Sequence, residues 1–259
     1  MTSEANLPED DAMTLSDYLE RGGKLTSPEN VPPRYRGELL RLMSSFVDSE
    51  LAGSAGFADA INWAPGLKER IAACRITLEK ADHAERVLDL MGDFGTDKAL
   101  YNKAHSWSAR QERDAQVDPK RQGGDMRLSV FHYPLQGWID AVVMNFLMGL
   151  ATVHQLQEQV RTSYQPLSEE FRAILPKERR HMELGLEGLA HVSQAPASRN
   201  EAIGSIAYWM PKVAQTFGPA QSARFDRLKK MGLRHTDNET LRGAWTADAD
   251  ACLAKLRLV

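Results

Sequence analysis

One segment of the chain, residues 136–162, is apolar on nearly every side of a helix, and this feature limits what the chain can fold into. A helix without a polar face must be surrounded by other elements. Its most apolar part, 139–153, contains Asp140 and Asn145 and is too short to span a bilayer. We therefore expect this helix at the centre of an all-α protein, with no membrane as a partner.

The rest of the sequence also follows helical spacing. After Pro32–Pro33, apolar residues recur three and four positions apart as far as Leu51. No stretch alternates apolar and polar residues as an exposed strand does. Pro176 either kinks its helix or begins a new one. The pattern predicts further helices over 32–53, 66–91, 97–110, 167–192 and 198–217, followed by two short C-terminal helices.

Composition and charge narrow the classes of function. The chain has 259 residues, of which 42% are hydrophobic and 26% charged, as in ordinary globular proteins. The net charge of −3 gives no electrostatic reason to expect nucleic acid or an anionic membrane as a partner. The N-terminus is polar, and Cys74 and Cys252 are too few for a disulfide framework. We predict free thiols and a cytoplasmic location.

The motif that carries chemistry is Glu178-x-x-His181. Residues three apart project from one face of a helix, so a carboxylate and an imidazole lie side by side. In ferritin-like four-helix bundles, this spacing on each of two helices, with a lone Glu from each of the others, holds two metal ions. The motif also occurs by chance on solvated helices. Further candidates lie on two other predicted helices: Glu50, and Glu79 or Lys80 with His83.

Several spaced motifs agree in order with one known family. The first group is Pro33, Tyr35, Arg36, Ser49, Glu50 and Ala64–Pro65, and the second is Ser129, Phe131, Tyr133, Pro134, Trp138, Asp140, Arg161 to Tyr164 and Pro166. Over about residues 30–220, the chain thereby resembles the PaaA/PaaC family, the ferritin-like subunits of the bacterial phenylacetyl-CoA ring epoxidase. It is most similar to the catalytic, PaaA-type subunit.

The resemblance implies a fold, a cofactor and partners. It implies an all-α, ferritin-like four-helix bundle with extra N- and C-terminal helices. It also implies a di-iron site that activates dioxygen and inserts one oxygen atom into the ring of an aryl-CoA thioester. Such a subunit receives electrons from a separate reductase and pairs with a sister ferritin-like subunit. The expected partners are therefore a ferritin-like subunit, as a homo- or heterodimer, a reductase and a CoA thioester.

Carried over residue by residue, the di-iron site is incomplete. The positions that match the family's ligands are Glu50, His83, Glu178 and His181. The family's second bridging glutamate falls on Lys80, and its second lone carboxylate falls on Gly149. An ammonium group repels a metal ion, and glycine has no donor atom. The resemblance therefore implies a degraded site.

Two alternatives follow for Lys80. In the first, Lys80 points inward and pairs with Glu50 and Glu178, as a counter-cation in place of the metal. In the second, Lys80 points outward and Glu79 replaces it as a ligand, because Glu79 and His83 share a helix face. The sequence leaves open whether iron is bound.

Two alternatives also stay open for the function of the protein. The chain is either an oxygenase-type component acting on an aryl-CoA thioester with an incomplete di-iron site, or a metal-free, non-catalytic scaffold or regulatory subunit of such a complex. Whether it is an enzyme stays open. We predict a partly ordered N-terminal arm over 1–31, a ferritin-like bundle over 32–220 and a C-terminal helical extension over 221–259.

Overall fold

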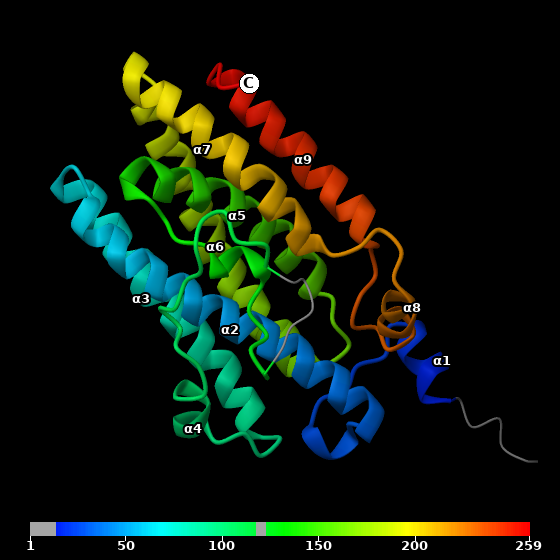
Figure 1. Cartoon of the computed structure of the whole chain (residues 1–259). Helices are drawn as coiled ribbons and strands as arrows, with labels where there is room; N and C mark the ends of the chain where they lie inside the picture. Colours follow the sequence, from blue (N-terminus) through cyan, green and yellow to red (C-terminus); the bar gives the residue numbers. More distant parts are fainter. Residues whose placement is uncertain (1–13, 118–122) are drawn as a thin grey trace, which may run out of the picture.

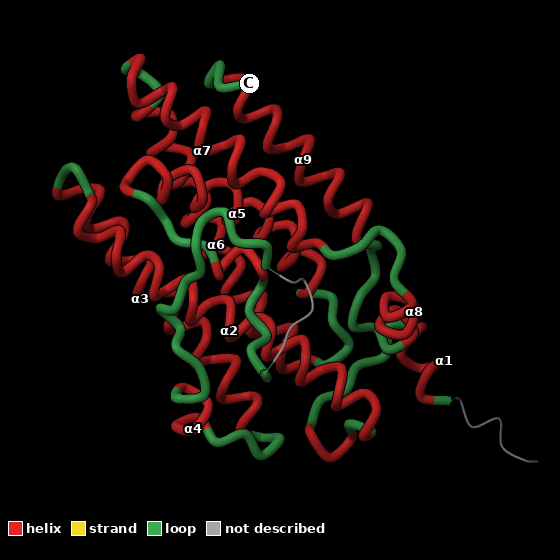
Figure 2. The backbone as a smooth tube through the Cα atoms, in the orientation of Figure 1, coloured by secondary structure: helices red, strands yellow, loops and turns green. Residues whose placement is uncertain are grey.

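The computed structural model of the protein describes residues 14–117 and 123–259, and this part of the chain is all-α (Figures 1 and 2). The predicted fold class is confirmed. The helices are α1 (Leu15–Glu20), α2 (Pro33–Trp63), α3 (Leu67–Gly92), α4 (Lys98–Asn102), α5 (Gly137–Gln159), α6 (Gln165–Val192), α7 (Pro196–Ala214), α8 (Ala223–Lys230) and α9 (Asn238–Lys255). Short 3₁₀ helices lie at Pro28–Asn30, Ser129–His132 and Gln215–Phe217.

Two helical hairpins form the bundle. Helix α2 packs along α3, and α5 packs along α6. The hairpins meet through α3 against α6 and α2 against α5 (Figure 1). The chain passes from the first hairpin to the second through one long connection, residues 93–136, which contains α4. A single long crossover between helix pairs is the topology of ferritin-like bundles.

Three helix boundaries differ from the sequence pattern. Helix α2 does not end at 53 but continues to Trp63, because Gly53 lies inside the helix and allows another helix to approach. A Cβ atom at Gly53 would lie 3.2 Å from Cδ of Lys80. The predicted helix 97–110 ends at Asn102, and α9 is a long helix rather than a short one. Helix α6 continues unbroken through Pro176.

The apolar core has two parts. One surrounds α5, α7 and α9, and the other lies between α2, α3 and α6 and includes residues from α1 and α8. The polar side chains of the candidate site lie between these two parts. Helix α5 belongs to both parts and is long and apolar enough to pass as a membrane span, with a mean hydropathy of 1.3, but 72% of its most apolar window is buried inside the protein.

The N-terminal arm contributes to the core where the structure describes it. Residues 1–13 lie outside the described part of the chain. Leu19 and Leu25 are buried, and the backbone of Leu25 pairs with Ser163 and Gln165 at the α5–α6 turn, both at 2.8 Å. At the other end of the chain, α8 contacts α1 and α9 packs against α5.

Buried Asp140 fastens α7 and the long connection to α5. Its carboxylate accepts hydrogen bonds from both terminal nitrogens of Arg113 (2.8 and 2.9 Å). Ser205 and the Trp209 indole, both on α7, donate two more at 2.7 and 2.8 Å. Burial alone would raise the pKa of Asp140, but Arg113 and the hydrogen bonds lower it below the ordinary value.

Because the folded pKa of Asp140 lies below the unfolded value of about 3.9, its contribution to stability is full above that pH and is lost as the pH falls through the folded pKa. We expect Asp140→Asn to lower the free energy of unfolding by about 2–3 kcal/mol at pH 7 and by less at pH 3. Urea denaturation at both pH values measures this. Asp89→Asn, which removes one partner of the exposed ion pair between Lys98 and Asp89, is the control. A loss that is the same at both pH values would contradict the role of Asp140.

Candidate buried ionic site

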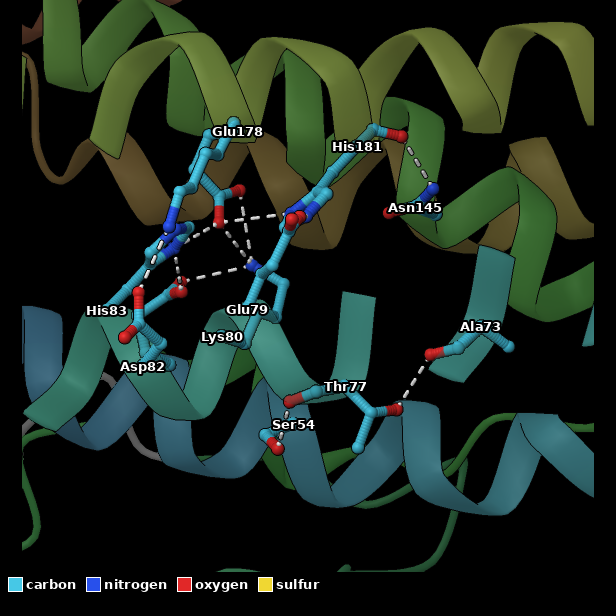
Figure 3. A network of polar contacts seen from close by, with 12 residues as sticks. Ser54, Ala73, Thr77, Glu79, Lys80, Asp82, His83, Asn145, Glu178 and His181 are labelled. Carbon is cyan, nitrogen blue, oxygen red and sulfur yellow. Dashed lines mark hydrogen bonds and ion pairs between the residues drawn. The ribbon is translucent and has the colours of Figure 1, made fainter. Parts of the chain in front are cut away.

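Five polar side chains from three helices meet between the two parts of the core (Figure 3). Helix α2 provides one of them, and α3 and α6 each provide a pair spaced three residues apart, so that each pair shares an inward face. Each of these residues is at most 6% exposed. These residues are Glu50, Lys80, His83, Glu178 and His181.

The Lys80 ammonium group lies at the centre of this cluster. Its Nζ donates to Oε1 of Glu50 at 3.1 Å and to Oε1 and Oε2 of Glu178 at 3.1 and 3.2 Å. Burial alone would lower the pKa of Lys80, but the charges of Glu178 and Glu50 raise it above the ordinary value. Burial would likewise raise the pKa of Glu178, whereas Lys80 and the two histidines hold it well below the ordinary value. Lys80 and Glu178 therefore form an ion pair inside the bundle.

His83 contacts the same two carboxylates. Its Nδ1 lies 3.2 Å from Oε2 of Glu50 and 3.0 Å from Oε1 of Glu178. Burial alone would lower the pKa of His83, but these hydrogen bonds raise it to about 9. With Lys80 and His83 protonated, two positive charges face the two negative charges of Glu50 and Glu178.

His181 lies at the edge of the cluster. Its Nδ1 is 3.3 Å from Oε1 of Glu178, and its ring stacks on that of His83 with centroids 5.9 Å apart. Its Nε2 lies 2.6 Å from Oε2 of Glu79, whose side chain is 27% exposed. Asn145 on α5 donates to the His181 backbone carbonyl at 2.8 Å. Glu79 therefore contacts the outer side of His181, while Lys80 fills the centre.

Gly149 lies where α5 and α6 touch. A Cβ atom at this position would be 3.1 Å from both Cα and Cβ of Met182. A residue with any side chain here would force the α6 backbone to move. The position consequently offers no donor atom, and a Cβ atom there would require α6 to give way by a few tenths of an ångström.

These residues do not fit a di-iron centre. Glu50, His83 and Glu178 each offer a ligand atom, and these atoms lie within 4.8 Å of one another, close enough for one metal ion. The same two carboxylates already bind the Lys80 ammonium. Gly149, where the resemblance places a second lone carboxylate, has no donor atom. A metal ion there would have to displace Lys80, and the described residues offer no second group of three ligand atoms that lie so close together.

A cavity of about 250 Å³ borders the cluster at Glu50. Apolar side chains from α2, α5 and the long connection form much of its wall: Leu42, Phe46, Leu128, Phe131, Met148 and Leu156. Three cationic side chains from separate segments, Arg41, Arg224 and Arg234, also line it. Such a cavity suits a ligand with an apolar body and an anionic group.

Two parts of this site are not evident from the sequence. The Asn145 bond to His181 had a weak signal, namely a polar residue in an otherwise apolar helix. No sequence pattern indicates that the three arginines of the cavity lie together, because they come from α2, from α8 and from the loop before α9. The sequence does not show that these segments meet.

Comparison with known proteins places the chain in a family. One component of the 1,2-phenylacetyl-CoA epoxidase of Escherichia coli (strain K12) is 25% identical over 193 residues. That match covers 73% of this chain but only 57% of the relative. The model of the family described as phenylacetic acid catabolic protein matches residues 13–259. In agreement with the resemblance read from the sequence motifs, this chain belongs to the phenylacetic acid catabolic protein family.

Proposed function

We propose that this protein is a metal-free, non-catalytic ferritin-like subunit of a ring-oxygenating system that acts on an aryl-CoA thioester such as phenylacetyl-CoA. The observation that carries the proposal is the position of Lys80, whose Nζ bonds both Glu50 and Glu178 in the centre of the cluster. A cation built into the chain supplies the charge that a metal ion supplies to such carboxylates.

Charge balance supports this reading. Burying two carboxylates without a counter-charge is energetically unfavourable. Lys80 and protonated His83 provide the compensating positive charges. Because the cluster is already neutral, adding a divalent ion would leave an excess of buried positive charge. The contact of His181 with Glu79 extends the hydrogen-bonded network, in which Nε2 of His83 and Nδ1 of His181 have no hydrogen-bond partner among the described residues.

The cavity beside Glu50 supports a retained binding role. Its apolar walls suit an aryl group, and guanidinium groups suit phosphate or carboxylate groups. The proposed partners are a ferritin-like subunit that carries the chemistry and a CoA thioester. In this role the protein holds or senses the ligand and does not oxidise it.

A second function is an iron-dependent oxygenase component that works with a reductase. The geometry of Glu50, His83 and Glu178 favours it, because one ligand atom of each lies close enough to the others to share an ion. This function requires Lys80 to leave the cluster. Metal content therefore separates the two proposals.

We expect the protein, expressed in iron-supplemented medium and gently purified, to contain far less than one iron per chain by elemental analysis. Lys80→Glu replaces the ammonium with a carboxylate beside the three close ligand atoms of Glu50, His83 and Glu178, and we expect this variant to bind up to about one metal ion per chain. Lys98→Glu, on the surface, is the matched control and should stay empty. One or two irons per chain in the parent would overturn the metal-free proposal and support the oxygenase.

A further inference from the structure

Helix α8 forms part of the wall of the cavity beside Glu50, although it is not a helix of the bundle. It packs chiefly against the short helix α1 (Figure 1). Leu228 is the only buried residue of α8, and its side chain and that of the half-buried Phe225 line the cavity. A segment with so little apolar contact opens at a lower free energy than the bundle helices.

Helix α8 lies at the end of the cavity that is farther from the ionic cluster. The cavity runs along α2 from Glu50 to Arg41, nine residues away, which is about 13 Å of helix. Arg224 of α8 lines the same cavity and pairs with Glu38, which lies about one turn before Arg41. A ligand whose apolar part reaches Glu50 therefore places its other end beside α8.

The segment that carries α8 is anchored at both ends. Asn238 donates to the carbonyl of Pro219 at 2.9 Å, and the backbone N–H of Ser163 donates to the carbonyl of Gly232 at 2.9 Å. Glycines with positive φ lie at these anchors, Gly218 at 85° and Gly232 at 63°. Backbone rotation at two such glycines allows a helix to move while its anchors stay in place.

A second cavity lies on the other side of α8, between this helix and α1. Its volume is about 370 Å³, and its lining includes Leu15 and Leu19 of α1 together with Arg227 and Lys230 of α8. Helix α8 is consequently unsupported over part of its outer side. The space that an outward movement of α8 requires is therefore present.

Glu38 on α2 holds the side of α8 that faces the first cavity. Its Oε2 accepts a hydrogen bond from Nε of Arg224 at 2.9 Å, and Nη2 of Arg227 lies 3.6 Å from its Oε1. Burial alone would raise the pKa of Glu38, but the hydrogen bond and the charge of Arg224 lower it below the ordinary value. An anionic ligand in the cavity competes with ionised Glu38 for the same guanidinium group.

We propose that α8 is the lid of this cavity and that Arg224 is its latch, bonded to Glu38 before binding and to the anionic group of the ligand afterwards. Binding then exchanges one ion pair for another, and the lid closes only on a ligand that carries an anionic group. The class of ligand, an apolar acyl group on an anionic carrier, rests on the proposed function, whereas the opening of α8 does not.

Hydrogen exchange of the full chain, followed by mass spectrometry, tests the lid without a ligand. Glu38→Gln removes the charge that holds the latch, and we expect the amides of α8 to exchange about fivefold faster than in the parent, with no change in α5. Glu85→Gln, which removes a surface carboxylate that pairs with Lys98, is the matched control and should leave α8 unchanged. Equal exchange of α8 in Glu38→Gln and the parent, or faster exchange of α5 as well, overturns the lid.

Isothermal titration calorimetry with phenylacetyl-CoA tests the exchange of partners. Arg224→Gln is expected to weaken binding about tenfold, because it removes the guanidinium group that the ligand takes over. Glu38→Gln is expected to tighten binding about threefold, because Arg224 no longer has to leave a carboxylate. A purely structural ion pair predicts that both variants weaken binding, since both loosen α8, and that result overturns the latch.

The lid and the proposed function fail on different results. A parent that does not bind phenylacetyl-CoA overturns the binding role in the proposed function and the ligand contact of Arg224, and the hydrogen exchange of α8 still decides whether this helix opens. A parent that binds the thioester while Glu38→Gln weakens that binding overturns the latch and leaves the proposed function in place.

Discussion

Replacing Lys80 with methionine is expected to lower the free energy of unfolding by about 3–5 kcal/mol, because it leaves two buried carboxylates without their central cation. Glu50 and Glu178 are 3% and 0% exposed, so water cannot compensate for the lost ammonium. His83 alone would then face both charges. Urea denaturation at neutral pH, monitored by circular dichroism, measures the loss.

Two further variants make the result specific to the buried charge. Lys98→Met removes a lysine that also pairs with two carboxylates, but on the surface, and should cost less than about 1 kcal/mol. Adding Glu178→Gln to Lys80→Met removes one of the stranded charges and should restore part of the stability. If Lys80→Met is as stable as the parent, or if Glu178→Gln destabilises it further, the counter-cation role of Lys80 is wrong.

Restoring a carboxylate at position 149 is expected to damage the fold rather than repair a metal site. Gly149→Glu should cost about 3 kcal/mol or more, because its Cβ would lie 3.1 Å from the α6 backbone at Met182. The new carboxylate would also be buried without a partner. Thermal and urea unfolding of the variant measure the cost.

A glycine elsewhere provides the control. Gly204 lies on an exposed part of α7, and a Cβ atom there would have no neighbour within 4 Å. Gly204→Ala should therefore raise the free energy of unfolding by about 0.5–1 kcal/mol, the intrinsic gain of alanine over glycine in a helix. A Gly149→Glu variant that is as stable as the parent, or that binds two metal ions together with Lys80→Glu, would contradict the close contact of α5 with α6.

Helix positions were predictable because a core-facing helix repeats its apolar residues with a fixed period. The end of α2 was not predictable in this way. Glycine often ends a helix, but Gly53 lies inside α2, where its missing side chain leaves room for Lys80. Local sequence cannot separate these two uses of glycine. The predicted continuation of helix to residue 110 is wrong for a similar reason: Arg110 donates to the carbonyl of Ala52 on a distant helix and does not extend α4.

The sequence indicates which residues could gather at the candidate site, but it does not indicate which of them occupies the centre. The three-residue spacings place Glu178 with His181, and Lys80 with His83, on single helix faces. Whether Lys80 or Glu79 points inward depends on how α3 is rotated in the bundle, which the sequence of one helix does not determine. The structure places Lys80 at the centre and Glu79 outside His181. The roles of these residues are what the variants above test.

The layer of charge between the two parts of the core also has a consequence for folding. Apolar helix faces can slide past one another by a turn at little cost, since one leucine replaces another. A slip of α3 against α6 would move Lys80 into apolar surroundings and leave Glu178 unpaired, so misaligned bundles are strongly penalised. The cluster thereby fixes the register of α2, α3 and α6 against one another. That use requires no chemistry, and it gives a chain without a metal a reason to keep buried carboxylates and histidines.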